Sequence, residues 1–501
     1  MMKSRELFLL IVVTCLAIGV YLMPISNSAL WNRIAGSGIN SQYGFPLDDA
    51  WIHQTYARNL ALHGEWAFIP GKPSGGSTSP LWSMLLSPAH LIFGEPYFWT
   101  YLLGGLSLLA LGIVSESLFR KSKVQSPLFF PCAGLFLVGE WHMVWAALSG
   151  METILLSLFV MIVFWLLLSE KKRWFIVGLL MGVSVWVRPD GITLFGPASL
   201  ALLYDFLQDK ARRLRFFIGT TIVLLSGFLV VFLPYLVFNE MVTGQLWPNT
   251  FYAKQAEYAV QREISLLFRL FNLMVLPSIG AGALLLPGFL YGLIRGIRNK
   301  DFLWLAGAAW WLGYTLIYAL RLPVTYQHGR YLMPAMPIYF VLGLIGSTQM
   351  LSALSIGRVQ FVLKNTWMVG TVGVWLGFYF LGMNAYARDV AIIETEMVRV
   401  AKWVAAELPS NSIIATHDIG ALGYFGKHNL VDLAGLISPE VIPFIRDEYR
   451  LAQYLDEQKV EYLVTFPSWY PKLVKNRQVI FSSGGNISIQ SGGENMQVFK
   501  W

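Results

Sequence analysis

The chain has 501 residues, of which 55% are hydrophobic and only 13% are charged. Soluble globular domains carry about 25% charged residues, so this composition excludes an ordinary soluble protein and indicates one that crosses a membrane several times. The net charge of +8 does not indicate nucleic-acid binding, because the basic residues form short clusters between apolar segments, as they do in the cytoplasmic loops of membrane proteins.

Apolar segments follow one another through the first three quarters of the chain. A bilayer core needs about 20 apolar residues per helix, and on this basis we predict eleven membrane-spanning helices. They are 7–24, 97–119, 128–145, 153–168, 174–187, 192–207, 216–238, 271–294, 302–320, 331–345 and 367–383. The segment 81–93 is apolar but short and contains Pro88, so it is left open as a juxtamembrane or re-entrant helix.

The basic clusters orient these predicted helices. Lys3, Arg5 and the clusters at 120–123, 171–173, 210–215, 295–300 and 358–364 all fall on one side. The positive-inside rule makes that side cytoplasmic, and we therefore expect a multi-pass protein of the cell membrane with its N-terminus in the cytoplasm. The exoplasmic side then receives the first loop, 26–80, the turns at 149–152 and 188–191, the segments 239–269 and 321–330, and the tail.

The tail differs in pattern from the rest of the chain. Residues 388–408 have helical periodicity, "SIIATHD" and "EYLVTFP" have the character of short buried strands, and residues 478–501 alternate strand-like runs with glycines. We therefore predict a transmembrane domain over 1–384 and a small exoplasmic α/β domain over 385–501, in a protein that is mainly α.

The first exoplasmic loop contains "GFPLDDAWIH", in which Asp48 and Asp49 are adjacent. Such a pair can be a solvated surface or a helix cap. It can also be catalytic, because a carboxylate at a membrane face can act as general base toward a hydroxyl while its neighbour orients it or holds a cation. His53 and Arg58 follow on a predicted helix, and "FIPGKPSGGSTSPLW" is dense in turn formers, which is typical of a loop that folds over a site.

A second acid, Glu152 in "LSGMET", lies at the exoplasmic end of two predicted helices. One interpretation is a helix N-terminal residue favoured by the helix dipole. The other is a partner of the acidic pair, which either binds a divalent cation together with Asp49 or shifts a pKa.

Three exoplasmic motifs are basic, although positive-inside statistics disfavour Lys and Arg on this side. They are "VRPDG", "WPNTFYAK" and "YQHGRYLMPAMP", and they contribute Arg188, Asn249, Tyr252, Lys254, His328, Arg330 and Tyr331. Each alone fits interfacial snorkelling beside belt aromatics. Together, and opposite two acidic motifs, they indicate an anionic phosphate held beside a carboxylate.

Two longer stretches complete this set of motifs, namely "PLDDAWIHQTYARNLALHGEWAFIPGKPSGGSTSPLW" in the first loop and "THDIGALGYFGKHNLVDLAGLISPE" in the tail. Taken together in chain order, the motifs resemble the GT-C superfamily of polyprenyl-phosphate-sugar glycosyltransferases. The resemblance covers most of the membrane part. It is closest to the mycobacterial terminal arabinofuranosyltransferase-like branch and more distant from protein mannosyltransferases and aminoarabinose transferases. "SGGSTSPLW" departs from the arabinosyl pattern at Gly75, Gly76 and Ser77, so arabinose is not carried over.

The resemblance implies that the first exoplasmic loop forms the active site. Asp48 is the first choice for the base that deprotonates the acceptor, and Asp49 the second. Glu152 corresponds to a second acid, and Glu152 and Asp49 are the candidate ligands of Mg²⁺ or Mn²⁺. Lys254, Arg330 and Arg188 are expected to hold the donor phosphate. Residues expected in the sugar or acceptor pocket are His53, Arg58, Asn249, Tyr252, His328 and Tyr331.

The predicted function is an inverting glycosyltransferase. It would move a hexosyl or pentosyl group from a polyprenyl-phosphate donor to a hydroxyl of an envelope glycan, lipid or protein on the exoplasmic face. One alternative is a transporter or flippase of lipid-linked sugars, whose binding groups would lie near the bilayer midplane. Another is a non-catalytic membrane component whose tail binds partners.

Overall fold

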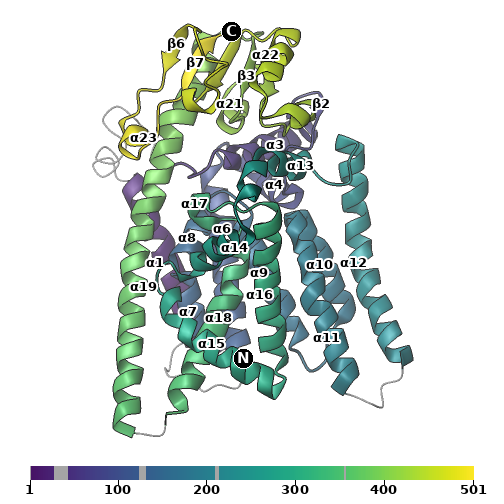
Figure 1. The fold of residues 1–501 in the computed structure, drawn as a ribbon, viewed down its shortest axis with the longest axis vertical. Helices are drawn as coiled ribbons and strands as arrows, with labels where there is room; N and C mark the ends of the chain where they lie inside the picture. Colours follow the sequence, from purple (N-terminus) through teal and green to yellow (C-terminus); the bar gives the residue numbers. More distant parts are fainter. Residues whose placement is uncertain (1, 27–42, 123–130, 209–213, 355–356) are drawn as a thin grey trace.

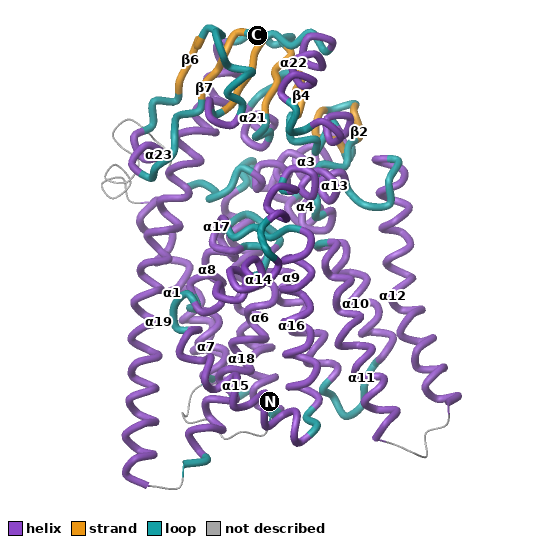
Figure 2. The backbone as a smooth tube through the Cα atoms, in the orientation of Figure 1, coloured by secondary structure: helices purple, strands orange, loops and turns teal. Residues whose placement is uncertain are grey.

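The computed structural model describes residues 2–26, 43–122, 131–208, 214–354 and 357–501. Long helices stand side by side, a small α/β domain covers one end of them, and the N-terminus lies toward the other end (Figure 1). Strands are confined to this domain and to one short hairpin (Figure 2). The predicted architecture, a mainly α membrane protein with a C-terminal α/β domain, is confirmed. Parts of the prediction lie outside the described residues, namely 27–42 of the first loop, 128–130, Lys123, Lys210, Arg212 and Arg213.

Within the described ranges, six helical segments are long and apolar enough to cross a membrane, and a seventh qualifies if a bent pair counts as one span. The six contain α1 (Ser4–Ser26), α6 (Tyr97–Lys121), α12 (Leu214–Thr243), α16 (Phe302–Arg321), α17 (Tyr326–Gly329) with α18 (Met336–Ser352), and α19 (Gly357–Ile393). The bent pair joins α14 (Leu266–Val275) to α15 (Gly282–Asn299) at 97°.

The other four predicted spans are helical but short. They contain α7 (Cys132–Val138) with α8 (Trp141–Leu148), α9 (Thr153–Leu167), α10 (Trp174–Val187) and α11 (Phe195–Gln208). The first of these spans is interrupted at Glu140, whose extended backbone ends α7 and whose carboxylate caps α8. The segment left open at 81–93 forms two helices of 7 and 5 residues, α4 (Pro80–Leu86) and α5 (Pro88–Ile92), which are too short to cross.

The described part of the first loop, residues 43–80, folds back into the protein instead of extending into solvent. Its helix α3 (Asp49–His63) is buried along most of its length and ends at Gly64, which has φ 68°. A hairpin, β1 (Ala67–Ile69) and β2 (Lys72–Pro73), follows. Helix α3 packs between α4 and a helix of the C-terminal domain, α21 (Gly420–Phe425), so this loop joins the bundle to the domain.

The C-terminal domain is a five-stranded sheet in the order β4-β3-β5-β7-β6. Its strands are β3 (Ile413–Thr416), β4 (Asn429–Asp432), β5 (Tyr462–Thr465), β6 (Val479–Ser482) and β7 (Gln497–Lys500). The first three pair in parallel, and β7 pairs antiparallel with β5 and β6. The strands predicted in "SIIATHD", in "EYLVTFP" and at the C-terminal end are all present.

The predicted tail helix continues α19 through a π-helical turn, η5 (Glu394–Val398), into α20 (Arg399–Glu407). Shorter elements complete the chain. They are η1 (Pro189–Leu194), α13 (Asn249–Glu257), η2 (Ala259–Glu263), η3 (Leu276–Ser278), η4 (Met333–Ala335), η6 (Pro439–Phe444), α22 (Glu448–Glu457), η7 (Pro467–Trp469) and α23 (Asn486–Gln490).

Candidate active site

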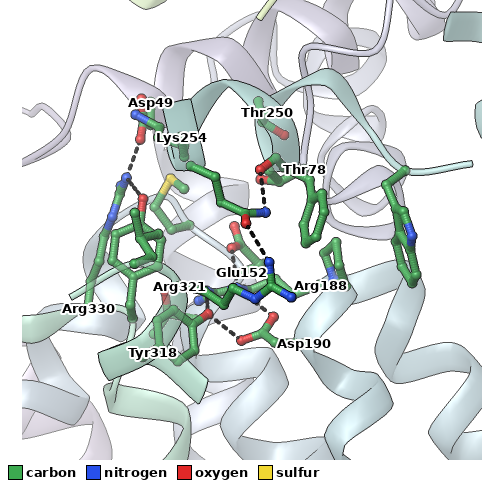
Figure 3. A pocket seen from close by; sticks show the side chains of 18 of the residues that line it. Asp49, Thr78, Glu152, Arg188, Asp190, Thr250, Lys254, Tyr318, Arg321 and Arg330 are labelled. Atoms are coloured by element: carbon green, nitrogen blue, oxygen red, sulfur yellow. Dashed lines mark hydrogen bonds and ion pairs between the residues drawn. The ribbon is translucent and has the colours of Figure 1, made fainter. Parts of the chain in front are cut away.

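A cavity of about 360 Å³ lies where the bundle meets α3 and α13 (Figure 3). Segments far apart in the sequence line it, including the first loop, the starts of α9 and η1, and the end of α16. Among the described residues its charged lining consists of Asp49, Glu152, Arg188, Asp190, Lys254, Arg321 and Arg330. Cations therefore outnumber carboxylates by one, so the cavity favours an anionic guest.

Asp49 is the first residue of α3, and its carboxylate accepts a hydrogen bond from Nη2 of Arg330. Burial opposes ionisation, but the charges of Arg330 and Lys254 hold the pKa of Asp49 well below its usual range. The Asp49 carboxylate is therefore ionised, and its side chain is 27% exposed at the cavity.

Arg330 reaches the cavity because the chain turns sharply just before it. Gln327, His328 and Gly329 all have positive φ, at 52°, 58° and 72°, a conformation that costs energy for the two non-glycine residues. Nε and Nη1 of Arg330 are buried without a hydrogen-bond partner. A guanidinium with unused donors in a closed site is suited to bind a further oxyanion.

Glu152 is the residue that directly precedes α9, and its carboxylate faces two groups in the cavity. Nε2 of His53 lies 3.4 Å from one carboxylate oxygen, and Nε of Arg188 lies 3.5 Å from the other. Burial acts against the charged form, yet these partners lower the pKa of Glu152. His53 is held by the hydroxyls of Ser83 and Ser77, at 3.0 and 3.2 Å from Nδ1. The predicted second acid is thus ionised and lies in the same cavity as Asp49.

Arg188 ends α10, where Pro189 starts a new turn. Its Nε lies 3.1 Å from Asp190 and its Nη2 donates to the hydroxyl of Tyr318 at 2.7 Å. The guanidinium also lies 5.3 Å from the ring centre of Tyr331. Arg188 is therefore fixed by several contacts, whereas Arg330 keeps unused donors.

Lys254 lies on α13, with its Nζ 3.7 Å from Oε2 of Glu257. Burial acts to lower the pKa of Lys254, but Asp49 and Glu257 hold it well above its usual range. The ammonium is charged and completes, with Arg330, a pair of cations beside Asp49.

The carboxylates predicted to bind a metal, Asp49 and Glu152, do not form a metal site with their neighbours. In the parts of the chain that the structure describes, no group of three or more His, Cys, Asp and Glu residues could hold a metal ion. The two acids contact Arg330 and Arg188. Binding of Mg²⁺ or Mn²⁺ by Asp49 and Glu152 therefore stays a prediction.

Asp48 and Arg58 lie outside the cavity lining and hold α21 at its two ends. The Asp48 carboxylate accepts hydrogen bonds from the backbone N–H groups of Gly420 and Ala421, at 2.7 and 2.8 Å. Arg58 donates to the carbonyls of Gly423 and Tyr424. Asp48 thus pairs N–H groups at the start of α21, and Arg58 pairs carbonyl groups near its end. We call these contacts the α21 clamp.

The remaining predicted residues divide between the cavity and its surroundings. His53 and Tyr331 line the cavity. Asn249 lies behind it and donates to the carbonyl of Leu436 at 3.1 Å. Tyr252 packs against Phe251. His328 lies between Trp141 and Trp145 and contacts Asp389 at 2.8 Å.

Sequence reasoning missed several lining residues. Asp190 and Arg321 carried a signal, since Asp190 is part of "VRPDG" and Arg321 is a cation on the predicted exoplasmic side. Tyr318 carried none, because it lies in an apolar helix. Leu436 lies in the tail motif that supported the resemblance, but nothing in that motif marked it as a lining residue. The full set also includes Thr78, Trp247, Thr250, Phe251, Gln255 and Leu322.

The α21 clamp leaves no room for a side chain at Gly420. A Cβ atom there would lie 2.0 Å from the carbonyl oxygen of Asp48. We expect Gly420→Ala to destabilise the protein by about 1–3 kcal/mol, the usual cost of overpacking, and to lower the midpoint of thermal unfolding in detergent. Gly377→Ala is the control, because nothing lies within 4 Å of that position. Equal midpoints for the two variants would contradict the close packing.

The long apolar helices indicate a polytopic membrane protein, and its overall fold is the GT-C fold that the sequence motifs predicted. Similar solved structures cover nearly all of it. ArnT from Cupriavidus metallidurans bound to undecaprenyl phosphate has a TM-score of 0.58 at 14% identity, covering 99% of this chain and 98% of that one. The specific branch of the superfamily stays a prediction.

Two further structures share the fold. The oligosaccharyltransferase AglB from Archaeoglobus fulgidus, in complex with an inhibitory peptide and a dolichol-phosphate, has a TM-score of 0.55 at 11% identity and covers 93% of this chain and 70% of that one. The arabinofuranosyltransferase AftD from Mycobacteria has a TM-score of 0.51 at 14% identity and covers 100% of this chain and 42% of that one. Residues 388–499 match a family described as "Domain of unknown function (DUF8728)". No curated protein matches the sequence.

Proposed function

We propose that this protein is a glycosyltransferase that moves a sugar from a polyprenyl-phosphate donor to a hydroxyl group of an acceptor. The observation that carries the proposal is the meeting of Asp49, Lys254 and Arg330 in one cavity, although they come from three distant parts of the chain. A carboxylate beside two cations is what an attacking hydroxyl and a departing phosphate require together.

The donor phosphate is assigned to Arg330 and Lys254, with Arg188 in the same cavity. The unused Nε and Nη1 donors of Arg330 can bind phosphate oxygens, and the ammonium of Lys254 balances the charge that develops as the sugar–phosphate bond breaks. Two proteins with this fold have been solved with undecaprenyl phosphate and with dolichol-phosphate, which supports a lipid phosphate as the carrier.

Asp49 is the proposed base, because its carboxylate lines the cavity whereas both oxygens of Asp48 accept backbone hydrogen bonds. The acceptor oxygen attacks the anomeric carbon, its proton passes to Asp49, and the bond to the phosphate oxygen breaks so that the lipid phosphate leaves as the anion. Direct attack from the opposite face inverts the anomeric centre.

The resting site holds Asp49 as a weak base, since its pKa is depressed by Arg330 and Lys254. A bound phosphate would compete for the same two cations. Their hold on Asp49 would weaken, its pKa would rise, and the carboxylate would become a better proton acceptor only when the donor is present. A carboxylate whose pKa rises when the donor is bound is favourable for general-base catalysis.

The cavity and the C-terminal domain lie at the same end of the bundle. Together with the basic clusters toward the other end, this supports a site on the exoplasmic face and a cytoplasmic N-terminus. The acceptor, a glycan, lipid or protein of the cell envelope, would then approach from outside the cell.

The proposal is tested by purified protein in liposomes that contain labelled polyprenyl-phosphate sugars. We expect label to appear in an acceptor fraction supplied from envelope extracts. A strain lacking the protein should accumulate the donor and lose one sugar from its envelope glycans, both measured by mass spectrometry. Movement of labelled lipid across the bilayer without any product would favour a transporter instead.

A further inference from the structure

The segment of the C-terminal domain that the α21 clamp holds also contacts the cavity wall. His417 follows β3 directly, three residues before α21, and its Nε2 lies 3.3 Å from Oε1 of Glu257 on α13. The other oxygen of Glu257 faces Lys254 at 3.7 Å. A chain of contacts therefore runs from the domain to the ammonium that lines the cavity.

His417 is itself held in place. Its Nδ1 lies 2.7 Å from the hydroxyl of Tyr470, and its ring packs edge-on against Trp469. Burial acts against charge on both His417 and Glu257. Even so, Glu257 raises the pKa of His417. In turn, Lys254 and His417 lower the pKa of Glu257 to about 2. Glu257 is therefore a carboxylate shared between two positive partners, one from each part of the protein.

The domain also contacts α13 at its first turn. Asn249, the first residue of α13, donates to the carbonyl of Leu436, and Leu436 itself lines the cavity. The domain thus touches both ends of the helix that carries Lys254. The clamp on α21 fixes the domain against α3, the helix that carries Asp49.

We propose that the C-terminal domain is a working part of the active site and that His417 is its positioning residue. By binding one oxygen of Glu257, His417 prevents that carboxylate from turning fully onto Lys254. The ammonium then stays directed toward the cavity, where it meets the lipid phosphate. This inference rests on the proposed function and names the residue that the domain contributes to it.

The test measures binding of undecaprenyl phosphate to the purified full-length protein. We expect His417→Ala to raise the dissociation constant about tenfold, a loss of about 1.4 kcal/mol. His417→Gln should bind nearly as well as the wild type, because its side-chain amide can still donate to Glu257. His428→Ala is the matched control, since His428 lies in the same domain but faces the carbonyl of Leu408.

Two further comparisons separate positioning from folding. His417→Phe keeps a ring against Trp469 but removes the donor, so it should bind as weakly as the alanine variant, with an unfolding midpoint no lower than that of the alanine variant. Wild-type binding by folded His417→Phe would overturn the inference and leave the proposed function standing. Absence of binding by the wild type would instead contradict the proposed function.

Discussion

Asp49→Asn is expected to lower the turnover number for sugar transfer about a thousandfold, within the range that loss of a general base produces. Asparagine has the same shape and can still accept the hydrogen bond that Arg330 donates to Asp49. The variant should therefore fold, retain lipid phosphate and lose only the proton acceptor. The measurement is single-turnover transfer from a preloaded donor, combined with undecaprenyl phosphate binding.

Asp48→Asn is the matched control for this prediction. Asparagine has one acceptor oxygen, and its amide group would face one of the two N–H donors of the α21 clamp. An unpaired buried donor costs about 1–3 kcal/mol, so we expect a lower unfolding midpoint but activity far above that of Asp49→Asn. The reverse ranking would return the role of base to Asp48, the first choice from the sequence alone.

The two adjacent aspartates show where sequence reasoning stops. The motif pointed to a turn of chain that lines the cavity through Asp49, because two carboxylates in a turn-rich loop beside a membrane are unusual. Which of them faces the cavity depends on where α3 begins and on Gly420, 372 residues away from Asp48. No local sequence pattern contains Gly420. The sequence could therefore rank Asp48 before Asp49 as the base, but it could not show which of the two lines the cavity.

The membrane helices were predictable for a simpler reason. Apolarity and length are local properties, and every predicted span is mainly helical over the residues that the structure describes. Their lengths were less predictable, because an apolar run does not reveal an interruption such as that at Glu140. Lys254 and Arg330 stood out in the sequence because they are cations on the predicted exoplasmic side, where the positive-inside rule disfavours them. Tyr318 was missed because tyrosine is ordinary in a membrane helix.

Arg330→Ala is expected to lower kcat/KM about a hundredfold, the lower end of the loss seen when one donor to a developing oxyanion is removed. Most of this loss should appear as a higher KM for the donor, because Arg330 is the cation with unused buried donors. Arg330→Lys should recover part of it, since an ammonium keeps the charge but not the planar fork. Arg446→Ala, at an exposed position of the C-terminal domain, should behave as the wild type.

The same variant tests the link between the phosphate site and the base. Arg330 and Lys254 depress the pKa of Asp49, so removing Arg330 must raise that pKa. Transfer requires ionised Asp49, and the rate is therefore expected to fall on acidification at a higher pH in Arg330→Ala than in the wild type. A pH profile of kcat/KM measures this shift. If the acid limb stayed in place while the donor KM rose, Arg330 would bind phosphate without controlling the base, and a group other than Asp49 would have to accept the proton.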